Sequence, residues 1–324
     1  MRMKVSVIVL NWNGQRWLEG CLSSILKQEM VGDPEILLVD NCSTDDSLEY
    51  VRRRFPGVRV VELDRNYGFA HGNNVGLEHS SGDHLVFVNT DTVAEDGWLN
   101  SLVRAADEHP EHQILCSIQL PSQGANRARV LNAKGYPMPS PRESRLETTD
   151  SLFASGACFL IRKAFVKEIG YLFDPFYFSY AEDLELSLRT ILLGGRIGYV
   201  RSSRILHYGG GAGLPSPIAA YFSMRNVLLT YYKLFGLEDF VRIFFVQCTY
   251  TFARLFARRQ QMRTTLGMLK GFFGFFANVH RYTEYHRMFL DRKKRDDKYI
   301  FERFLYGTRT EQLVLKRAVY GCRS

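Results

Sequence analysis

The sequence predicts an α/β fold in which helices cover both faces of a largely parallel sheet. In the first third of the chain, short apolar runs typical of buried strands alternate with helix-like segments. Such alternation implies parallel strands joined by helices. The hydrophobic fraction of 46% and the charged fraction of 23% are those of an ordinary globular protein. With 324 residues, the chain can form one large α/β domain plus an appendage, or two modest domains.

Four strands and three helices are expected in this first third. A helix is predicted over residues 17–28, where apolar positions follow the helical period, and a short one over 69–78. Another helix is expected after Ser43 and Thr44, whose hydroxyls can cap it. The strands are expected at residues 5–10, 35–39, 59–62 and 85–88.

The remaining chain is expected to be less regular before it becomes helical. Residues 121–141 are rich in Pro, Ser, Arg and Gly, which predicts a long mobile loop. Two more strands are expected, at residues 151–161 and 196–200. Helices are expected at residues 181–193, 217–234, 240–256 and 266–279.

Polar side chains follow several of the predicted strands at the point where each strand ends. Asn11, Asp40, Asn66 and Asp91 all have this placement. In an open α/β sheet the ligand site lies beyond the carboxyl ends of the strands, so these residues mark a candidate site. The turn after the first strand reads NWNGQRW and lacks the G-x-G-x-x-G fingerprint, which argues against a nicotinamide dehydrogenase. A bound nucleotide would then need a metal to hold its phosphates.

The net charge of +8 is concentrated in the C-terminal region. Residues 233–324 contain 19 Lys and Arg against 8 Asp and Glu, whereas the first 232 residues contain 23 against 26. This region is also rich in aromatic residues, which suits an interfacial helix on an anionic bilayer. The aromatic residues could instead pack on the rest of the chain or on a second subunit. Nucleic acid is not expected, because no nucleic-acid module accompanies the basic run 292–295.

The six cysteines are scattered and show no spacing typical of a zinc site or a redox dithiol. A reduced, cytoplasmic compartment fits this usage. Neither a secretory signal nor an apolar run of the ~18–20 residues that a membrane span needs is recognised. The expected location is therefore cytoplasmic, with peripheral contact to the cytosolic face of the membrane through residues 233–324.

A series of motifs occurs in a fixed order along residues 4–232. They read VSVIVLNWNG, EILLVDNCSTDDS, RNYGFAHGNNVGL, HLVFVNTDT, SGACFLIRKAF, YFSYAEDLELSLR and ILHYGGG. With these motifs the chain resembles family 2 glycosyltransferases, in particular the rhamnosyltransferase-like group that builds bacterial polysaccharides. The resemblance implies the GT-A nucleotide-diphospho-sugar transferase fold, which is Rossmann-like with a mostly parallel central sheet. It also implies inverting transfer from a UDP-, dTDP- or GDP-linked sugar with Mn²⁺ or Mg²⁺.

The resemblance divides the chain into a catalytic domain and an extension. Residues 1–232 would form the GT-A domain, with a nucleotide-binding half at about 1–110 and an acceptor half at 111–232. Residues 233–324 would form a helical, basic, aromatic-rich extension. The acceptor would be a cell-surface glycan or a lipid-linked precursor, and an oligomer is compatible with the sequence.

The nucleotide-binding residues implied by the resemblance follow the first three strands. Asp40 would recognise the nucleoside, since a carboxylate can accept hydrogen bonds from a base imide or a ribose hydroxyl. The alternative is that Asp40 only begins a turn. Asn11 and Arg65 would line the same pocket, and Asn66 and Asn73 lie in the stretch that matches the family's N-x-G-F-A pattern.

The metal site implied by the resemblance centres on Asn89-Thr90-Asp91, where the family usually has D-x-D. Asn89 is a weaker ligand for a hard cation and would instead contact the ribose or the sugar. Asp91 supplies the carboxylate that a divalent cation needs, and His207 would complete the site. The metal would bridge the diphosphate and offset the charge on the departing nucleotide. The glycines 209–211 suggest a loop that orders over the donor.

Glu182 and Asp183 begin the helix predicted at 181–193. Carboxylates are common at helix N-termini for electrostatic reasons alone. In the setting Y-x-E-D-x-E-L-x-L-R, the resemblance implies that Asp183 is the general base for the acceptor hydroxyl. Glu182 would orient the acceptor or share that task.

Three other classes of function compete with an enzyme of this family. A non-catalytic module that binds sugar nucleotides or glycans would share the fold, but the acidic positions and the histidine are all present. A membrane-docking scaffold would leave the motif-rich first two thirds unexplained. A nucleotidyltransferase would be expected to carry a glycine- and Arg/Lys-rich phosphate loop after the first strand, which NWNGQRW does not resemble.

Overall fold

The computed structural model describes residues 4–28, 33–120, 129–132, 134–140, 144–209, 214–257 and 262–305. The chain separates into two compact units, each described by itself below. The sheet unit comprises Met1–Ala128, Pro141–Phe178 and Gly195–Gly213. The helical unit comprises Arg129–Ser140, Ser179–Gly194 and Leu214–Ser324. By packing, the helices that cover residues 182–192 and 216–234 thus belong with the C-terminal helices, while the boundary at residue 232 stays a prediction.

The sheet unit contains a nine-stranded sheet in the described part of the chain, ordered β3-β2-β1-β4-β10-β6-β11-β5, with β9 paired to β11. Six strands (β1 to β4, β6 and β11) share one direction, because β10 pairs antiparallel with both β4 and β6. The mostly parallel α/β fold is therefore confirmed. The strands are β1 Val5–Asn11, β2 Glu35–Asp40, β3 Arg59–Glu62, β4 His84–Asn89, β5 Thr92–Ala94, β6 Ile114–Leu120, β9 Thr148–Ser151, β10 Cys158–Arg162 and β11 Ile197–His207.

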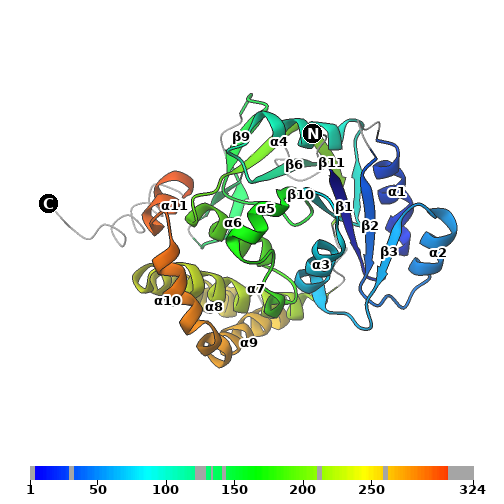
Figure 1. The fold of residues 1–324 in the computed structure, drawn as a ribbon. Coiled ribbons are helices and arrows are strands. Elements are labelled where there is room, and N and C mark those ends of the chain that lie inside the picture. Colours follow the sequence, from blue (N-terminus) through cyan, green and yellow to red (C-terminus); the bar gives the residue numbers. More distant parts are fainter. Residues whose placement is uncertain are drawn as a thin grey trace. The chain divides into compact units, whose positions relative to one another are not determined.

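Helices cover both faces of this sheet because side chains alternate along each strand. Val7 and Val9 of β1 belong to an apolar cluster with residues of α1, α2 and α4. Ile8 faces α3, where a Cβ on Gly76 would lie only 2.4 Å from the Ile8 Cγ2. Figure 1 shows β1, β2 and β3 side by side in blue. The helices are α1 Gln15–Leu26, α2 Ser47–Arg54, α3 Gly68–His79, α4 Trp98–Glu108 and α5 Lys163–Ile169, with a 3-10 turn at Pro175–Tyr177.

The helical unit combines helices with one short hairpin. The hairpin corrects the prediction of a loop over 121–141: within that stretch, residues 129–131 and 137–139 pair as antiparallel strands β7 and β8. The buried Tyr231 hydroxyl donates to the carbonyl oxygen of Gly135 at 2.9 Å and so ties the hairpin to a helix. Residues 121–128, 133 and 141 of the predicted loop lie outside the described part. The elements are β7 Arg129–Leu131, β8 Pro137–Pro139, α6 Glu182–Leu192, α7 Ser216–Leu234, α8 Leu237–Ala257, α9 Met262–Asn278, a 3-10 turn at Val279–Tyr282, α10 Thr283–Arg292 and α11 Asp297–Phe304.

Helices α7 and α9 pack closely because glycines line the face of α9 that meets α7. A Cβ on Gly267 would lie 2.2 Å from the Pro217 carbonyl oxygen, and one on Gly271 would lie 2.7 Å from the Met224 Cβ. Glycine is thus required for this approach of the two backbones. Across the described residues, no helix is both long enough and apolar enough to span a bilayer.

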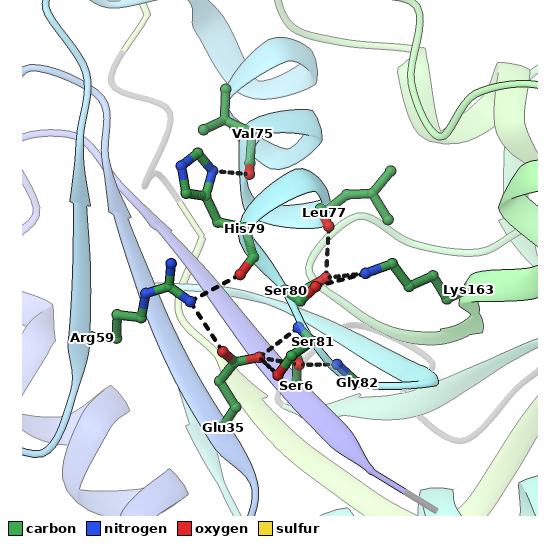
Figure 2. Close-up of polar contacts among 10 residues, drawn as sticks. All are labelled: Ser6, Glu35, Arg59, Val75, Leu77, His79, Ser80, Ser81, Gly82 and Lys163. Atoms are coloured by element: carbon green, nitrogen blue, oxygen red, sulfur yellow. Dashed lines mark hydrogen bonds and ion pairs between the residues drawn. The ribbon is translucent and has the colours of Figure 1, made fainter.

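A carboxylate-centred network fixes the start of β2 to the turn before β4, as Figure 2 shows. Glu35 accepts hydrogen bonds from the Ser6 hydroxyl at 2.5 Å and from the backbone N–H and hydroxyl of Ser81, both at 2.8 Å. The Arg59 guanidinium lies 3.2 Å from the other Glu35 oxygen. Burial opposes ionisation of Glu35, but the hydrogen bonds from Ser6 and Ser81 outweigh it and lower the pKa of this carboxyl to about 2.

We expect Glu35→Gln to lower the free energy of unfolding at pH 7 by about 2–3 kcal/mol. The reason is that each unit by which folding lowers the pKa of a carboxyl group stabilises the fold by about 1.4 kcal/mol. The native pKa of Glu35 lies below its ordinary value, so its contribution is complete above about pH 4.5 and is lost as the pH falls towards 2. Urea unfolding of wild type and variant at pH 7 and pH 3 measures this. A difference that stays constant between the two pH values would contradict the account.

Candidate active site

Asn11 and Asp40 end the parallel strands β1 and β2 in direct register. Both are buried, and the Asn11 Nδ2 donates to the Asp40 Oδ1 at 2.8 Å. The Ser43 hydroxyl and backbone N–H donate to the two Asp40 oxygens at 2.6 and 2.8 Å. Asp40 therefore does hold a turn, as the simpler interpretation proposed. Its Oδ2 accepts one of these bonds and keeps a lone pair that could meet a ligand.

The prediction that Ser43 and Thr44 cap the next helix was wrong. Helix α2 begins at Ser47, with Asp46 before it. The Thr44 backbone N–H instead donates to the Asn13 Oδ1 at 2.7 Å. Asn13 has a φ of 50°, in the left-handed region that Asn tolerates. These bonds fix the loops after β1 and β2 to one another, which a local capping pattern could not show.

Asn41, the residue after Asp40, holds the turn that precedes α3. Its Nδ2 donates to the Asn66 Oδ1 at 2.9 Å and to the Gly68 carbonyl at 3.1 Å. Its Oδ1 accepts from the Tyr67 N–H at 2.9 Å. Asn66 is thus placed beside the end of β2. Asn41 thus positions residues of the candidate site, a contact that the sequence pattern did not predict.

The two other residues expected near the nucleotide have different surroundings. Arg65 is exposed, and its guanidinium lies 4.4 Å from the centre of the Tyr67 ring. Asn73 is buried, and its Nδ2 donates to the Phe69 carbonyl at 2.9 Å, within the same helix α3. In this structure Asn73 therefore makes a contact internal to its helix.

Asp91 and His207 meet although they lie more than a hundred residues apart in the chain. Strand β11 runs antiparallel to β5, and this register places His207 opposite Thr92, the residue after Asp91. The His207 Nε2 lies 3.4 Å from the Asp91 Oδ1. The Asp91 side chain is 2% exposed and that of His207 is 25% exposed. Asn89 is half-buried at the end of β4, just before them.

This pair fits a divalent cation. A buried carboxylate and an imidazole nitrogen are suitable ligands, and they converge from two strands. Among the described residues, no cluster of three ligands includes Asp91, so a cation here would need further oxygens such as those of a diphosphate. The Tyr208 ring stacks on Trp17 at 5.1 Å and so ties the end of β11 to α1. Of the predicted glycine loop, residues 210 and 211 lie outside the described part.

In the helical unit, Glu182 and Asp183 begin α6 after an unusual stretch of backbone. Tyr180 and Ala181 have φ values of 70° and 64°, which cost free energy in residues other than glycine. The buried Asn226 holds this stretch, because its Nδ2 donates to the carbonyls of Ser179 at 3.0 Å and Tyr180 at 2.7 Å. Sequence reasoning missed Asn226, since nothing in the pattern of α7 distinguishes it.

The two adjacent carboxyl groups have different environments. Glu182 is buried, and its Oε2 has no hydrogen-bond partner among the described residues. Burial, and then the negative charge of Asp183, raise the pKa of Glu182 well above its ordinary range. A protonated Glu182 can donate a hydrogen bond. Asp183 is partly exposed, and its Oδ1 accepts from the Leu184 N–H at 2.9 Å.

A buried ion network anchors α6 one turn further on. Glu185 accepts from the Arg189 Nε at 3.1 Å, and the Lys233 Nζ of α7 lies 3.1 Å from the same carboxylate. The three side chains are at most 1% exposed. Lys233 also lies 5.0 and 5.1 Å from the ring centres of Tyr282 and Tyr285. The network thus joins α6 to α7 and to the chain around α10.

Comparison with known proteins places the chain in a family. A family model described as glycosyl transferase family 2 matches residues 6–170, just over half of the chain. The poly(ribitol-phosphate) beta-N-acetylglucosaminyltransferase TarS of Staphylococcus aureus is 27% identical over 214 residues, which cover 64% of this chain and 35% of TarS. The N-acetylglucosaminyl-diphospho-decaprenol L-rhamnosyltransferase of Mycobacterium tuberculosis is 27% identical over 227 residues, covering 60% and 74%. The chain spans only about a third of TarS.

Solved structures share the fold. TarS residues 1–349 in complex with UDP-GlcNAc gives a TM-score of 0.58 at 20% identity, covering 90% of this chain and 89% of that one. GalNAc-T7 with UDP, GalNAc and Mn²⁺ gives a TM-score of 0.68 at 18% identity, covering 93% and 57%. Both likenesses agree with the GT-A fold that the motifs implied. The ordered motifs, the fold and the match to more than half of its length show that the chain belongs to glycosyl transferase family 2.

Proposed function

We propose that the chain transfers a sugar from a nucleoside diphosphate sugar to an acceptor hydroxyl with inversion at the anomeric carbon. The observation that carries this proposal is the meeting of Asp91 and His207 at the strand-end edge of the sheet. The proposal draws further support from the relatives, since TarS is named as a sugar transferase and was solved with UDP-GlcNAc.

The donor would be held along the ends of the strands. Asp40, positioned by Asn11, would accept a hydrogen bond from the base or the ribose. Asn66 and Arg65 would border the same pocket, and Asn89 would contact the ribose or the sugar. Asp91 and His207 would bind Mn²⁺ or Mg²⁺, which offsets the charge that develops on the leaving diphosphate.

The acceptor would be activated by the pair at the start of α6. Asp183 would take the proton from the acceptor hydroxyl while its oxygen bonds to the anomeric carbon and the bond to the diphosphate oxygen breaks. Glu182 would stay protonated, because burial raises its pKa, and would donate a hydrogen bond that orients the acceptor. Asn226 would keep both carboxyl groups in place through the carbonyls of the preceding turn.

A panel of nucleoside diphosphate sugars in a thermal-shift assay tests donor binding. UDP-GlcNAc is tested first, and then dTDP- and GDP-linked sugars. Each is measured with Mn²⁺, with Mg²⁺ and with chelator. A donor at about 100 times its Kd should add about 2.7 kcal/mol and raise the Tm by several degrees. We expect one donor to act only with metal, and Asp91→Ala to abolish its effect.

The same panel separates a transferase from a binding module. One relative, 27% identical over 226 residues, is named an inactive polypeptide N-acetylgalactosaminyltransferase-like protein 5, of Macaca fascicularis. Donor binding without release of nucleoside diphosphate, with any acceptor, would favour a module of this kind. If no donor stabilises the protein although it is folded, both functions, transferase and binding module, would be contradicted.

We further propose that the helical unit docks on an anionic membrane surface at the cytosolic face, where a lipid-linked acceptor would lie. Large apolar side chains are exposed on α8 and α9, including Phe245, Phe252, Phe273 and Phe276 at 57–75% exposure. A groove of about 470 Å³ between α7 and α9 is mostly apolar but carries Arg263 and Lys270. Exposed aromatics beside cations suit the boundary between lipid headgroups and acyl chains.

Flotation with liposomes tests this docking. Wild type should float with vesicles of phosphatidylcholine and phosphatidylglycerol, and less so at high salt. The double variant Phe273→Ser and Phe276→Ser should bind at least about tenfold more weakly, since burying one Phe contributes about 1.5–3 kcal/mol. Leu146→Ser, which alters an equally exposed residue of the sheet unit, serves as the control. Equal flotation of wild type and double variant would overturn the proposal.

A further inference from the structure

A cluster of metal-ligating side chains lies in the turn between α4 and β6, where the chain reads His-Pro-Glu-His over residues 109–112. The His112 N–H donates to the His109 carbonyl at 3.0 Å and closes the turn. The Glu111 Oε1 lies 3.3 Å from the Nδ1 of His109 and 3.3 Å from the Nδ1 of His112. One ligand atom from each of the three residues lies within 4.8 Å of the others.

The protonation of His112 is fixed by its other ring nitrogen. His112 is 4% exposed, and its Nε2 lies 2.9 Å from the Asp150 Oδ1 in β9. The Arg196 guanidinium donates to the same oxygen at 2.8 Å, so this Asp150 oxygen acts as an acceptor. The proton of a neutral His112 therefore sits on Nε2, and Nδ1 presents a lone pair.

This nitrogen lies beside a carboxylate. The His112 Nδ1 is buried and has no hydrogen-bond partner in the described chain, and it lies 3.3 Å from the Glu111 Oε1, which is also in contact with the His109 Nδ1. A metal ion bound here would satisfy the unpartnered Nδ1 of His112 and the negative charge of Glu111 together. The half-exposed side chains of His109 and Glu111 leave a path from solvent to this point.

The two contacts of Glu111 have the length expected of ligand pairs on a tetrahedral metal, and the three ligand atoms lie within 4.8 Å of one another. With bonds of about 2.0–2.1 Å to nitrogen or oxygen, two ligand atoms on a tetrahedral Zn²⁺ lie about 3.3 Å apart. Both contacts of the Glu111 oxygen have this length. A buried imidazole that donates its second N–H to a carboxylate is also the usual outer arrangement of a zinc-bound histidine, and here Asp150 supplies it.

We propose that His109, Glu111 and His112 bind Zn²⁺, with Asp150 as the positioning partner of His112 and water as the fourth ligand. Two imidazoles favour zinc, whereas the carboxylate-centred pair at Asp91 suits Mn²⁺ or Mg²⁺. The ion would join the end of α4 to the start of β6, and through Asp150 to β9, inside the sheet unit. It would therefore stabilise the fold and needs no substrate.

Titration of metal-stripped, untagged protein with Zn²⁺ tests the site, and Asp91→Asn is used as the background so that the other candidate site does not contribute. We expect one equivalent of Zn²⁺ by calorimetry, a higher Tm, and the absorption of tetrahedral cobalt when Co²⁺ replaces zinc. His109→Ala and Glu111→Gln alter half-exposed side chains, and each should abolish tight binding of Zn²⁺. Asp150→Asn should weaken it by roughly 10- to 100-fold.

The matched control is His79→Ala combined with Glu78→Gln, which removes an exposed His and Glu from α3. This variant should bind Zn²⁺ as the background protein does. The proposal would be overturned if the background protein bound no Zn²⁺ tightly. It would also be overturned if the protein still bound one Zn²⁺ per chain after His109→Ala and Glu111→Gln were combined.

Discussion

Asp183→Asn is expected to lower kcat by about 10²- to 10⁴-fold, the range typical of a lost general base. The affinity for the donor should not change, because the donor residues belong to the strand ends and not to α6. The measurement is release of nucleoside diphosphate in the presence of acceptor, together with donor binding by calorimetry. Asp291→Asn, an exposed acid of the same unit, serves as the control.

The neighbouring carboxyl group provides an internal comparison. A glutamine resembles a protonated glutamate, so Glu182→Gln should lose less activity than Asp183→Asn. Because burial raises the pKa of Glu182, wild type should keep this proton to a higher pH than an ordinary carboxyl group does, and lose it, with activity, as the pH rises further. The variant should lack that alkaline limb. A larger loss in Glu182→Gln than in Asp183→Asn would exchange the roles of the two residues.

Glu185→Gln is expected to lower the free energy of unfolding by about 3–5 kcal/mol, the cost of breaking a buried ion network by removing one partner. The substitution leaves two buried cations, Arg189 and Lys233, without their shared counter-charge. Urea unfolding followed by circular dichroism measures the change. Glu302→Gln, at an exposed position of α11, should stay within about 0.5 kcal/mol of wild type.

Lys233→Met tests the reason for that loss. It removes one cation and leaves the Glu185–Arg189 pair balanced, so it should lower the free energy of unfolding clearly less than Glu185→Gln does. Equal costs would mean that packing, and not charge balance, dominates at this position.

The sequence pattern predicted the parts of the fold that depend on neighbouring residues. Strand β3 has the expected bounds, and α6 to α9 lie close to their predicted ranges, because helical and strand periods are local. The β7–β8 hairpin was missed, since its strands have only three residues each and β8 begins and ends with proline. The reversed direction of β10 was not foreseen, because pairing with β4 and β6 is decided by distant chain segments.

For the candidate site, too, some residues could be proposed from the sequence and others could not. Asp40 and Asp91 could be proposed as site residues because they stand at the ends of strands, and the family resemblance added His207. Asn41 and Asn226 were not found, because each acts by bonding the backbone of a segment far away in the sequence. The buried partners of Glu185 were equally hidden, since Lys233 looks like any polar residue at the end of a helix.

The proposed function requires that the strand-end edge of the sheet hold a nucleoside diphosphate through a cation on Asp91 and His207. Calorimetric titration of UDP, GDP and dTDP with and without Mn²⁺ tests it directly, on wild type, Asp91→Asn, His207→Ala and the exposed control Asp64→Asn. The account predicts that Mn²⁺ tightens binding of one nucleotide by roughly 5- to 150-fold in wild type and control. Both site variants should lose this effect. Equal tightening in Asp91→Asn would contradict the account.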